Sequence, residues 1–498
     1  MTFATAQRRQ PATELIYRTA TELASMIRQR QVSAAEVVEA HLEQIGRHNE
    51  RLNSIVTLDS DRARQRAAEA DADLARGRLW GPLHGVPVTI KDAFETSGLR
   101  TTSSHRPLLE YLPKTDATPV ARLRQAGAII LGKTNMPELA MDLQSNSPLF
   151  GPARNPWDAT RTPGGSTGGG AAAVAAGFSP LELGSDIGGS IRIPSHFCGV
   201  LGCKPTEHLV SSAGHIPELP GQLRTTRHLG VFGPLARSLE DLRLALVLMS
   251  GSDGRDWEVP PVSLVEQPVP DLADLRIAWT DDFAGVPVSG ETRTMLSDLA
   301  DRLSNVGCRV ERSSPVDFDF EAAWQTYGEI LGAEVGFNVS RALRAASRLV
   351  GPIIFRKVPL YRAINRGVTL GLRDYMSALV RRDSLIAALE RFLSKWDAWI
   401  CPVASTPAFT HRSSGLPRST RPIDVDGREL EYYTATMSYA TPFNLTGSPV
   451  IILPVALTHD GMPIAVQVVG RRWQDMGLLA AASRLQEVTG PFRRPPGY

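Results

Sequence analysis

Residues 184–194 read Gly-Ser-Asp-Ile-Gly-Gly-Ser-Ile-Arg-Ile-Pro, and a second glycine- and serine-rich stretch, Pro-Gly-Gly-Ser-Thr-Gly-Gly, precedes them at residues 163–169. Two glycines immediately before Ser190 let the backbone bend sharply and approach a ligand closely. Their N–H groups can point at one spot and stabilise an oxyanion, which favours a hydrolytic nucleophile at Ser190. Taken alone, however, the segment is more typical of a glycine-rich turn beside a helix.

Two other segments match known motifs by spacing, but their surroundings argue against the chemistry of those motifs. Residues 127–134 have P-loop spacing, yet Ala-Ile-Ile-Leu fills the middle and is typical of a buried strand rather than a phosphate-binding loop. Residues 164–168 match the G-x-S-x-G nucleophile elbow, which requires a hydrophobic strand before it. Residues 160–163, Thr-Arg-Thr-Pro, are not such a strand, and no histidine is singled out as a partner.

The composition indicates an ordinary globular protein of 498 residues with a formal net charge of +2. This charge gives no indication of binding to nucleic acid or to a membrane surface. The four cysteines are too few and too scattered to predict a disulfide framework or a zinc site. No run of 18 apolar residues occurs, and no apolar segment follows Arg8 and Arg9. We therefore expect a cytoplasmic protein, either monomer or homodimer, that binds neither nucleic acid nor membrane.

Helical and strand-like patterns alternate along most of the chain, which predicts an α/β fold with a single large mixed sheet surrounded by helices. Capping-box spacing after Thr19 and Ser33 predicts two early helices. We expect one domain over residues 1–498, divided into five segments. These are a helical segment at 1–80, a core at 81–250, a linker or insertion at 251–272, a helical cover of the substrate pocket at 319–396, and a return to the sheet at 430–498.

Read together, seven segments resemble the amidase signature family of serine hydrolases. They occur in the family's order, and the resemblance runs from about residue 14 to about residue 490. The matching segments are residues 85–92, 132–138, 163–169, 186–194, 197–199, 204–206 and 461–470. Each of these segments is weak evidence alone, whereas their joint occurrence is highly specific.

The resemblance implies a catalytic triad of Ser190 as nucleophile, Ser166 as proton relay after a cis peptide bond, and Lys91 as base. The spacing agrees with the family, because 75 residues separate Lys91 from Ser166 and 24 separate the two serines. The resemblance also implies that the backbone amides of Ile187, Gly188, Gly189 and Ser190 form the oxyanion hole. Many members have serine at position 167, whereas this chain has Thr167, which keeps the hydroxyl.

Further residues take supporting roles in the family. Asp186 and Arg192 flank the nucleophile and are implied to hold the site together, although a surface ion pair is the alternative. Ala140, Met141 and Gln144 stand where family members line the acyl pocket, and a core position is the alternative for Met141.

The proposed chemistry needs a neutral lysine amine. A serine hydroxyl is a poor nucleophile until a base takes its proton, and a lysine in water has a pKa of about 10.4. Burial disfavours the ammonium form and can lower this pKa by several units. Because Lys91 ends the apolar run at residues 86–90, its amine can lie in a desolvated pocket. Such a mechanism requires no metal and no organic cofactor.

The expected substrate is a small-molecule amide or carbamate, and esters present the same carbonyl. Apolar residues between 319 and 396 favour aryl or hydrophobic groups; these residues are Trp324, Tyr327, Leu331, Ile353, Phe355, Leu360 and Tyr361. Two alternatives stay open. One is the glutaminase (A) component of a tRNA-dependent amidotransferase, in which threonine usually stands in place of Ile187. The other is a catalytically silent binding protein on the same fold.

Overall fold

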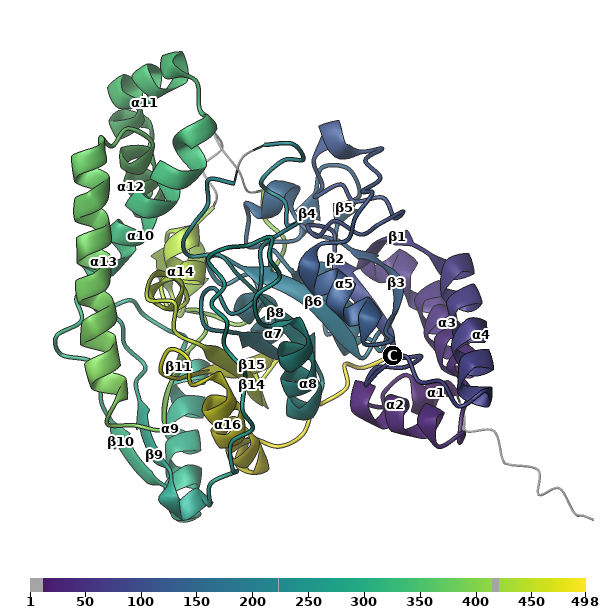
Figure 1. Ribbon diagram of the computed structural model, residues 1–498. Coiled ribbons are helices and arrows are strands. Elements are labelled where there is room, and N and C mark those ends of the chain that lie inside the picture. Colours follow the sequence, from purple (N-terminus) through teal and green to yellow (C-terminus); the bar gives the residue numbers. More distant parts are fainter. Residues whose placement is uncertain (1–11, 223, 414–420) are drawn as a thin grey trace, which may run out of the picture.

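The computed structural model describes residues 12–222, 224–413 and 421–498. In this part of the chain, a mixed sheet of 11 strands is surrounded by helices (Figure 1). The predicted fold, an α/β structure with one large mixed sheet, is confirmed.

The strands have the following bounds: β1 Ile55–Leu58, β2 Pro87–Lys91, β3 Ile129–Thr134, β4 Asn146–Ser147, β5 Gly151–Pro152, β6 Leu181–Asp186, β7 Leu201–Lys204, β8 Val231–Ala236, β9 Arg276–Trp279, β10 Arg309–Arg312, β11 Ala398–Pro402, β12 Ile423–Val425, β13 Arg428–Leu430, β14 Val450–Leu457 and β15 Pro463–Val469. The order in the large sheet is β1-β3-β2-β6-β8-β7-β14-β15-β11-β9-β10. Two small hairpins, β4–β5 and β12–β13, lie outside it.

The α-helices have the following bounds: α1 Ala12–Leu15, α2 Ala20–Arg28, α3 Ala34–Leu52, α4 Ser60–Ala75, α5 Thr118–Gln125, α6 Gly168–Ala175, α7 Arg192–Cys198, α8 Leu239–Met249, α9 Gly290–Asn305, α10 Phe320–Val335, α11 Arg341–Ile354, α12 Pro359–Val368, α13 Leu372–Leu393, α14 Tyr432–Met437, α15 Thr441–Leu445 and α16 Asp475–Thr489. Both predicted capping boxes are present, because Thr19 and Ser33 each accept a hydrogen bond from the backbone N–H three residues later.

Strands β3, β2 and β6 run parallel, and this arrangement positions the site. The carboxyl ends of parallel strands meet at the same edge of a sheet, which is where ligands bind in α/β folds. The segments that follow β2 and β6 therefore come together there. Strand β3 excludes the P-loop alternative, because Gly132, Lys133 and Thr134 lie inside this strand and not in a phosphate-binding loop.

The large sheet separates two hydrophobic cores. Along β14 the buried side chains alternate, so that Ile451 and Leu453 join one core while Val450 and Ile452 join the other. This alternation follows from the two-residue period of a strand. The first core lies against α2, α3, α8, α9 and α16, whereas the second lies against α10, α13, α14 and α15.

One strand was missed, because β1 lies within the segment 1–80, which was expected to be helical, and pairs with β3. Residues 251–271 contain neither helix nor strand. Helices α10 to α13 form the left side of the view in Figure 1 and stand away from the amino-terminal helices. None of the described helices combines the length and the hydropathy that a membrane span requires.

Candidate active site

The side chain of Lys91 lies at the end of β2 and is fully buried. Its Nζ donates hydrogen bonds to Ser166 Oγ at 2.7 Å and to Ser185 Oγ at 2.9 Å. Burial lowers the pKa of Lys91 to about 7, although the carboxylates of Asp186 and Glu182 favour the charged form. The amine is therefore substantially neutral near pH 7 and can accept a proton.

Ser166 is held in a close-packed turn at the start of α6. The peptide bond between Gly165 and Ser166 is cis, as the family resemblance implied. A Cβ at Gly165 would lie 2.6 Å from the backbone nitrogen of Gln144, so only glycine fits at this position. Ser145 Oγ accepts the N–H of Gly168 at 2.9 Å and lies 3.4 Å from the carbonyl oxygen of Ser166.

Ser190 lies in the loop between β6 and α7, and its side chain is almost completely buried. The N–H of Thr167 donates to the carbonyl oxygen of Ser190 at 3.1 Å, which ties the two serine-rich segments together. Thr167 Oγ1 donates to the carbonyl oxygen of Ser185 at 3.2 Å, so its hydroxyl keeps a role in this network. Lys91, Ser166, Ser190 and their neighbours thus lie in one buried region.

Asp186 and Arg192 form a fully buried ion pair with 3.0 Å between Arg192 Nη2 and Asp186 Oδ1. Asp186 also accepts the backbone N–H groups of Gly189 and Ile191 at 2.8 and 3.0 Å. Burial would raise the pKa of Asp186, but Arg192 and these hydrogen bonds outweigh it and keep the pKa below its usual range. The alternative of a surface ion pair is excluded, because both side chains are buried. The pair instead joins the two ends of the nucleophile loop, since Asp186 ends β6 and Arg192 begins α7.

The four backbone amides predicted to form the oxyanion hole differ in availability. The N–H of Gly189 already donates to Asp186. Within the described residues, the N–H groups of Ile187, Gly188 and Ser190 donate to no other protein atom. Three of the four amides are therefore free to bind a developing negative charge.

A family model described as Amidase matches residues 36–479. The chain belongs to the amidase signature family. Its relatives act on carbon–nitrogen bonds, and the family assignment made from the sequence is confirmed.

Similar proteins cover almost the whole of this chain. The A component of the glutamyl-tRNA(Gln) amidotransferase of Moorella thermoacetica is 32% identical over 97% of this chain and 99% of its own length. A solved structure of an amidase is 29% identical, with a TM-score of 0.76 over 94% of this chain and 99% of its own. A chain from a vestigial protein complex that reveals the evolutionary origins of an s-triazine catabolic enzyme is 30% identical, with a TM-score of 0.79 over 96% and 100%.

The three residues predicted to line the acyl pocket differ in their surroundings. Gln144 is fully buried, and both ends of its amide bond to the backbone of Arg412, at 2.9 and 3.2 Å. Gln144 therefore anchors a loop. The side chain of Met141 is 65% exposed, so the alternative of a core position is wrong. Ala140, Met141 and Gln144 are all absent from the lining of the large cavity between α10, α12 and α14.

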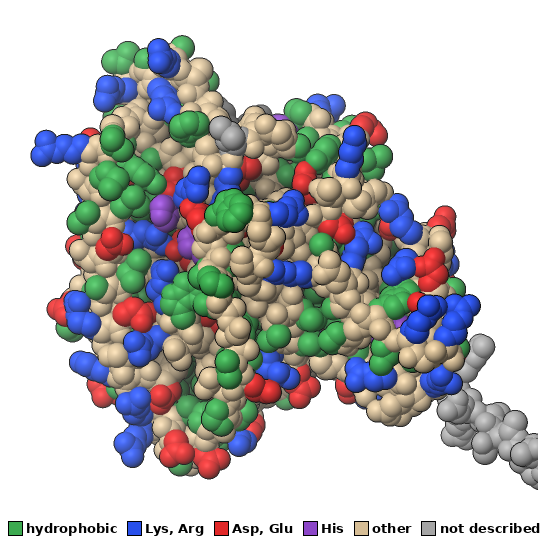
Figure 2. All heavy atoms as spheres, in the orientation of Figure 1, with side chains coloured by type: hydrophobic (Ala, Val, Ile, Leu, Met, Phe, Trp, Pro, Cys, Tyr) green, Lys and Arg blue, Asp and Glu red, His purple; other side chains and the backbone are tan. Residues whose placement is uncertain are grey.

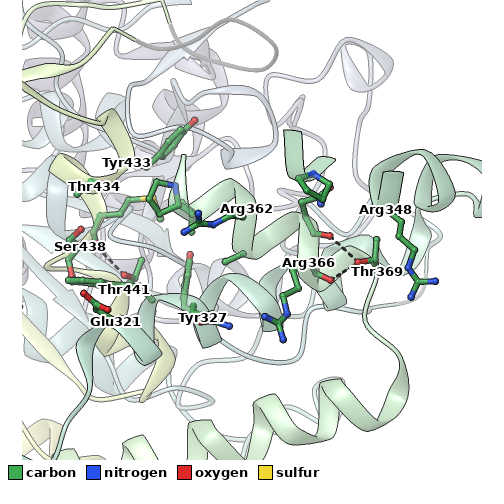
Figure 3. Close-up of a pocket in the computed structure, with 18 residues that line it drawn as sticks. Glu321, Tyr327, Arg348, Arg362, Arg366, Thr369, Tyr433, Thr434, Ser438 and Thr441 are labelled. Atoms are coloured by element: carbon green, nitrogen blue, oxygen red, sulfur yellow. Dashed lines mark hydrogen bonds between the residues drawn. The ribbon is translucent and has the colours of Figure 1, made fainter. Parts of the chain in front are cut away.

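This cavity has a volume of about 870 Å³ (Figure 3). It touches the nucleophile loop through Tyr327, whose hydroxyl donates to the carbonyl oxygen of Ile187 at 3.0 Å. A Cβ at Gly188 would collide with Tyr327 and Met437, which are both lining residues. Two side chains of the cavity wall therefore pack against the loop that carries Ser190.

The cavity wall is only partly as expected. Trp324, Tyr327 and Leu360 line it, whereas Ile353 is 71% exposed and is not among the lining residues. The arginines of the wall were not predicted from the sequence; they are Arg348, Arg362 and Arg366.

The contact of Ser185 with Lys91 was also missed. Ser185 stands inside the segment 184–194, five residues before the predicted nucleophile. Its place next to Asp186, inside the motif, was the available signal.

Proposed function

We propose that this chain hydrolyses small-molecule amides through a Ser190–Ser166–Lys91 triad and an acyl-enzyme. The observation that carries the proposal is the buried contact between Lys91 Nζ and Ser166 Oγ, together with the lowered pKa of Lys91. A silent binding protein would have no need of a desolvated lysine held against a serine hydroxyl. Aryl and hydrophobic amides are the preferred class, and carbamates and esters are further candidates.

The proposed reaction begins when neutral Lys91 draws the proton of Ser190 through the hydroxyl of Ser166. Ser190 Oγ then forms a bond to the substrate carbonyl carbon, and the resulting oxyanion is held by the free amides of the nucleophile loop. In a related setting, one such donor contributes about 3–4 kcal/mol to transition-state stabilisation. The proton returns by the same route to the leaving nitrogen as the C–N bond breaks. Water then hydrolyses the acyl-enzyme and regenerates Ser190.

A fluorophosphonate probe tests the nucleophile directly. We expect labelling of Ser190 in the purified protein and loss of both labelling and amide turnover in Ser190→Ala. Ser377→Ala is the control, because Ser377 is an exposed serine on α13. Labelling of Ser190→Ala at the wild-type rate would refute the assignment of the nucleophile.

A panel of substrates tests the substrate class. It contains p-nitroanilides, aryl carbamates and p-nitrophenyl esters with acyl groups of increasing length. We expect the larger apolar acyl groups to have higher kcat/KM than acetyl, because Trp324, Tyr327 and Leu360 line the cavity. Highest activity on small polar amides would contradict this part of the proposal.

A second candidate is the glutaminase component of a tRNA-dependent amidotransferase, which the sequence relatives favour. The corresponding A components from three bacteria are between 31 and 34% identical to this chain and cover 94–97% of it. Ile187, where those proteins usually carry threonine, argues for the stand-alone amidase. Assay of the purified chain with glutamine and with an anilide, and no added partner, separates the two functions. Ammonia release from glutamine without anilide hydrolysis would favour the amidotransferase component.

A further inference from the structure

The cavity beside the nucleophile loop carries an excess of positive charge. Arg348 on α11 and Arg362 and Arg366 on α12 line it, and Glu321 is the one acidic residue in the described lining. Figure 3 shows Arg362 extending from α12 toward the side formed by Tyr433 and Thr434, whereas Glu321 lies near Ser438 and Thr441. Within the described residues, Glu321 forms no ion pair with any of the three arginines.

Two of these three arginines have no acidic partner in the described part of the chain. Arg366 pairs with Glu329 at 3.0 Å, and Glu329 also pairs with Arg381. By contrast, within the described residues neither Arg348 nor Arg362 forms an ion pair or a side-chain hydrogen bond. Their guanidinium groups are free to donate to a ligand, and Figure 2 shows further Lys and Arg side chains over the region of α11 to α13.

A guanidinium matches one chemical group especially well. Its planar fork donates two parallel hydrogen bonds to a carboxylate, which adds both energy and geometric selectivity. The rest of the wall is largely apolar and aromatic, with Trp324, Leu360, Met437 and Tyr433. Such a wall accommodates the carbon skeleton of a ligand, while the arginines bind its charged end.

We infer that the cavity selects amides that carry a carboxylate remote from the scissile bond, and that Arg362 binds this carboxylate. The inference rests on the proposed amide hydrolysis and narrows its substrate class from apolar amides to acidic ones with an apolar body. Tyr327, which lines the cavity, donates to the carbonyl oxygen of Ile187, so the cavity wall contacts the nucleophile loop three residues before Ser190.

Two pairs of matched substrates test the inference. Glutaryl and pentanoyl p-nitroanilide differ only in a terminal carboxylate on the acyl side. The acetyl amides of 4-aminobenzoate and 4-toluidine differ in the same way on the amine side. We expect wild-type kcat/KM to be at least about tenfold higher for the acidic member of one pair. Exposed arginines bind a carboxylate less strongly than buried ones, which sets this modest factor.

Variants then assign the preference to the arginines. We expect Arg362→Gln to lower kcat/KM for the acidic substrate about tenfold while changing the neutral one less than about twofold. Arg362→Glu reverses the preference. Arg373→Gln is the matched control, since Arg373 is an exposed arginine on α13 outside the cavity lining and its replacement leaves both substrates unaffected.

The outcomes separate this inference from the proposed function. Equal kcat/KM for both members of both pairs in the wild type overturns the inference, even though amide hydrolysis stands. An acidic preference that survives in the double variant Arg348→Gln/Arg362→Gln also overturns it. Absence of hydrolysis of every amide, acidic or neutral, counts against the proposed function instead. Unchanged turnover of the neutral substrate shows that each variant is folded.

Discussion

At the Nζ atom of Lys91, two opposing effects set the protonation state. Burial disfavours the ammonium form and lowers the pKa to about 7, while Asp186 and Glu182 raise it. Only the neutral amine can accept the proton of the serine relay. We therefore expect kcat/KM to reach its full value at pH values well above 7 and to fall as the pH drops through about 7. A stopped assay between pH 5 and 10 on a neutral anilide measures this limb.

Replacement of Lys91 tests whether this residue causes the acidic limb of the pH profile. Lys91→Ala is expected to lower kcat by several decades at every pH. A profile that stays flat from pH 6 to 10 in the wild type contradicts the role of Lys91 as the base.

Glu182 provides a test of the electrostatic control of Lys91. Its side chain is fully buried, it accepts a hydrogen bond from Thr134 Oγ1 at 2.6 Å, and it favours the charged form of Lys91. Burial raises the pKa of Glu182 to about 7, so its side chain carries most of its negative charge above that pH. Glu182→Gln retains the acceptor oxygen and removes this charge. We expect the acidic limb of the pH profile to move to lower pH, because the ammonium loses a favourable neighbour. Movement to higher pH contradicts this electrostatic role.

Single residues differ in how far the sequence alone predicts their place. Lys91, Ser166 and Ser190 stand in motifs of fixed order, so their grouping could be expected from the sequence. The Arg362 guanidinium could not be expected in the cavity, because arginines occur on many faces of the helices between 319 and 396. Whether a charged residue on a helix faces a cavity or solvent depends on neighbours that are distant in sequence.

Among the elements, the loop between β6 and α7 depends on the buried ion pair of Asp186 and Arg192. Removing one partner leaves an uncompensated charge in the interior, which costs about 3–5 kcal/mol. We expect Arg192→Met to lower the free energy of unfolding by this amount and to abolish activity. Urea denaturation followed by circular dichroism measures the loss.

A double variant distinguishes the lone charge from lost packing. Asp186→Leu/Arg192→Met removes both charges, so it should regain part of the stability that Arg192→Met loses. A double variant that is no more stable than the single one would show that packing, rather than charge, dominates at this site.

The elements themselves were predictable to different degrees. Helices α2 and α3 begin after Thr19 and Ser33, where a capping box is visible in the sequence alone. Strand β1 was missed because it has only four residues between two helical segments. Its pairing with β3 joins Ile55 to Thr134, a contact that no local pattern specifies.

Across the whole molecule, the carboxyl-terminal segment returns to the amino-terminal helices (Figure 1). Phe492 stacks on Tyr17 with 6.4 Å between ring centroids. The guanidinium carbon of Arg494 lies 3.9 Å from the centroid of the Tyr17 ring. Tyr498 contacts His48 at 5.0 Å between centroids. These contacts join opposite ends of the sequence, so they could not be predicted from local patterns.

The contacts of the carboxyl-terminal segment lead to a prediction in which stability falls while catalysis is unchanged. Deletion of residues 492–498 removes two ring contacts and two cation–π contacts, each worth about 0.5–1.5 kcal/mol. Because a chain of this size has a large unfolding entropy, we expect the melting temperature to fall by only about 2–4 °C. Phe492 also packs against the hydrophobic cluster that includes α6, but within the described residues no hydrogen bond or ring contact joins the deleted residues to the triad, so the turnover number should stay unchanged. Scanning calorimetry and an anilide assay on the same sample measure both quantities, and Arg493→Gln serves as the control. A large loss of turnover with an unchanged melting temperature would mean that this segment acts on the site itself.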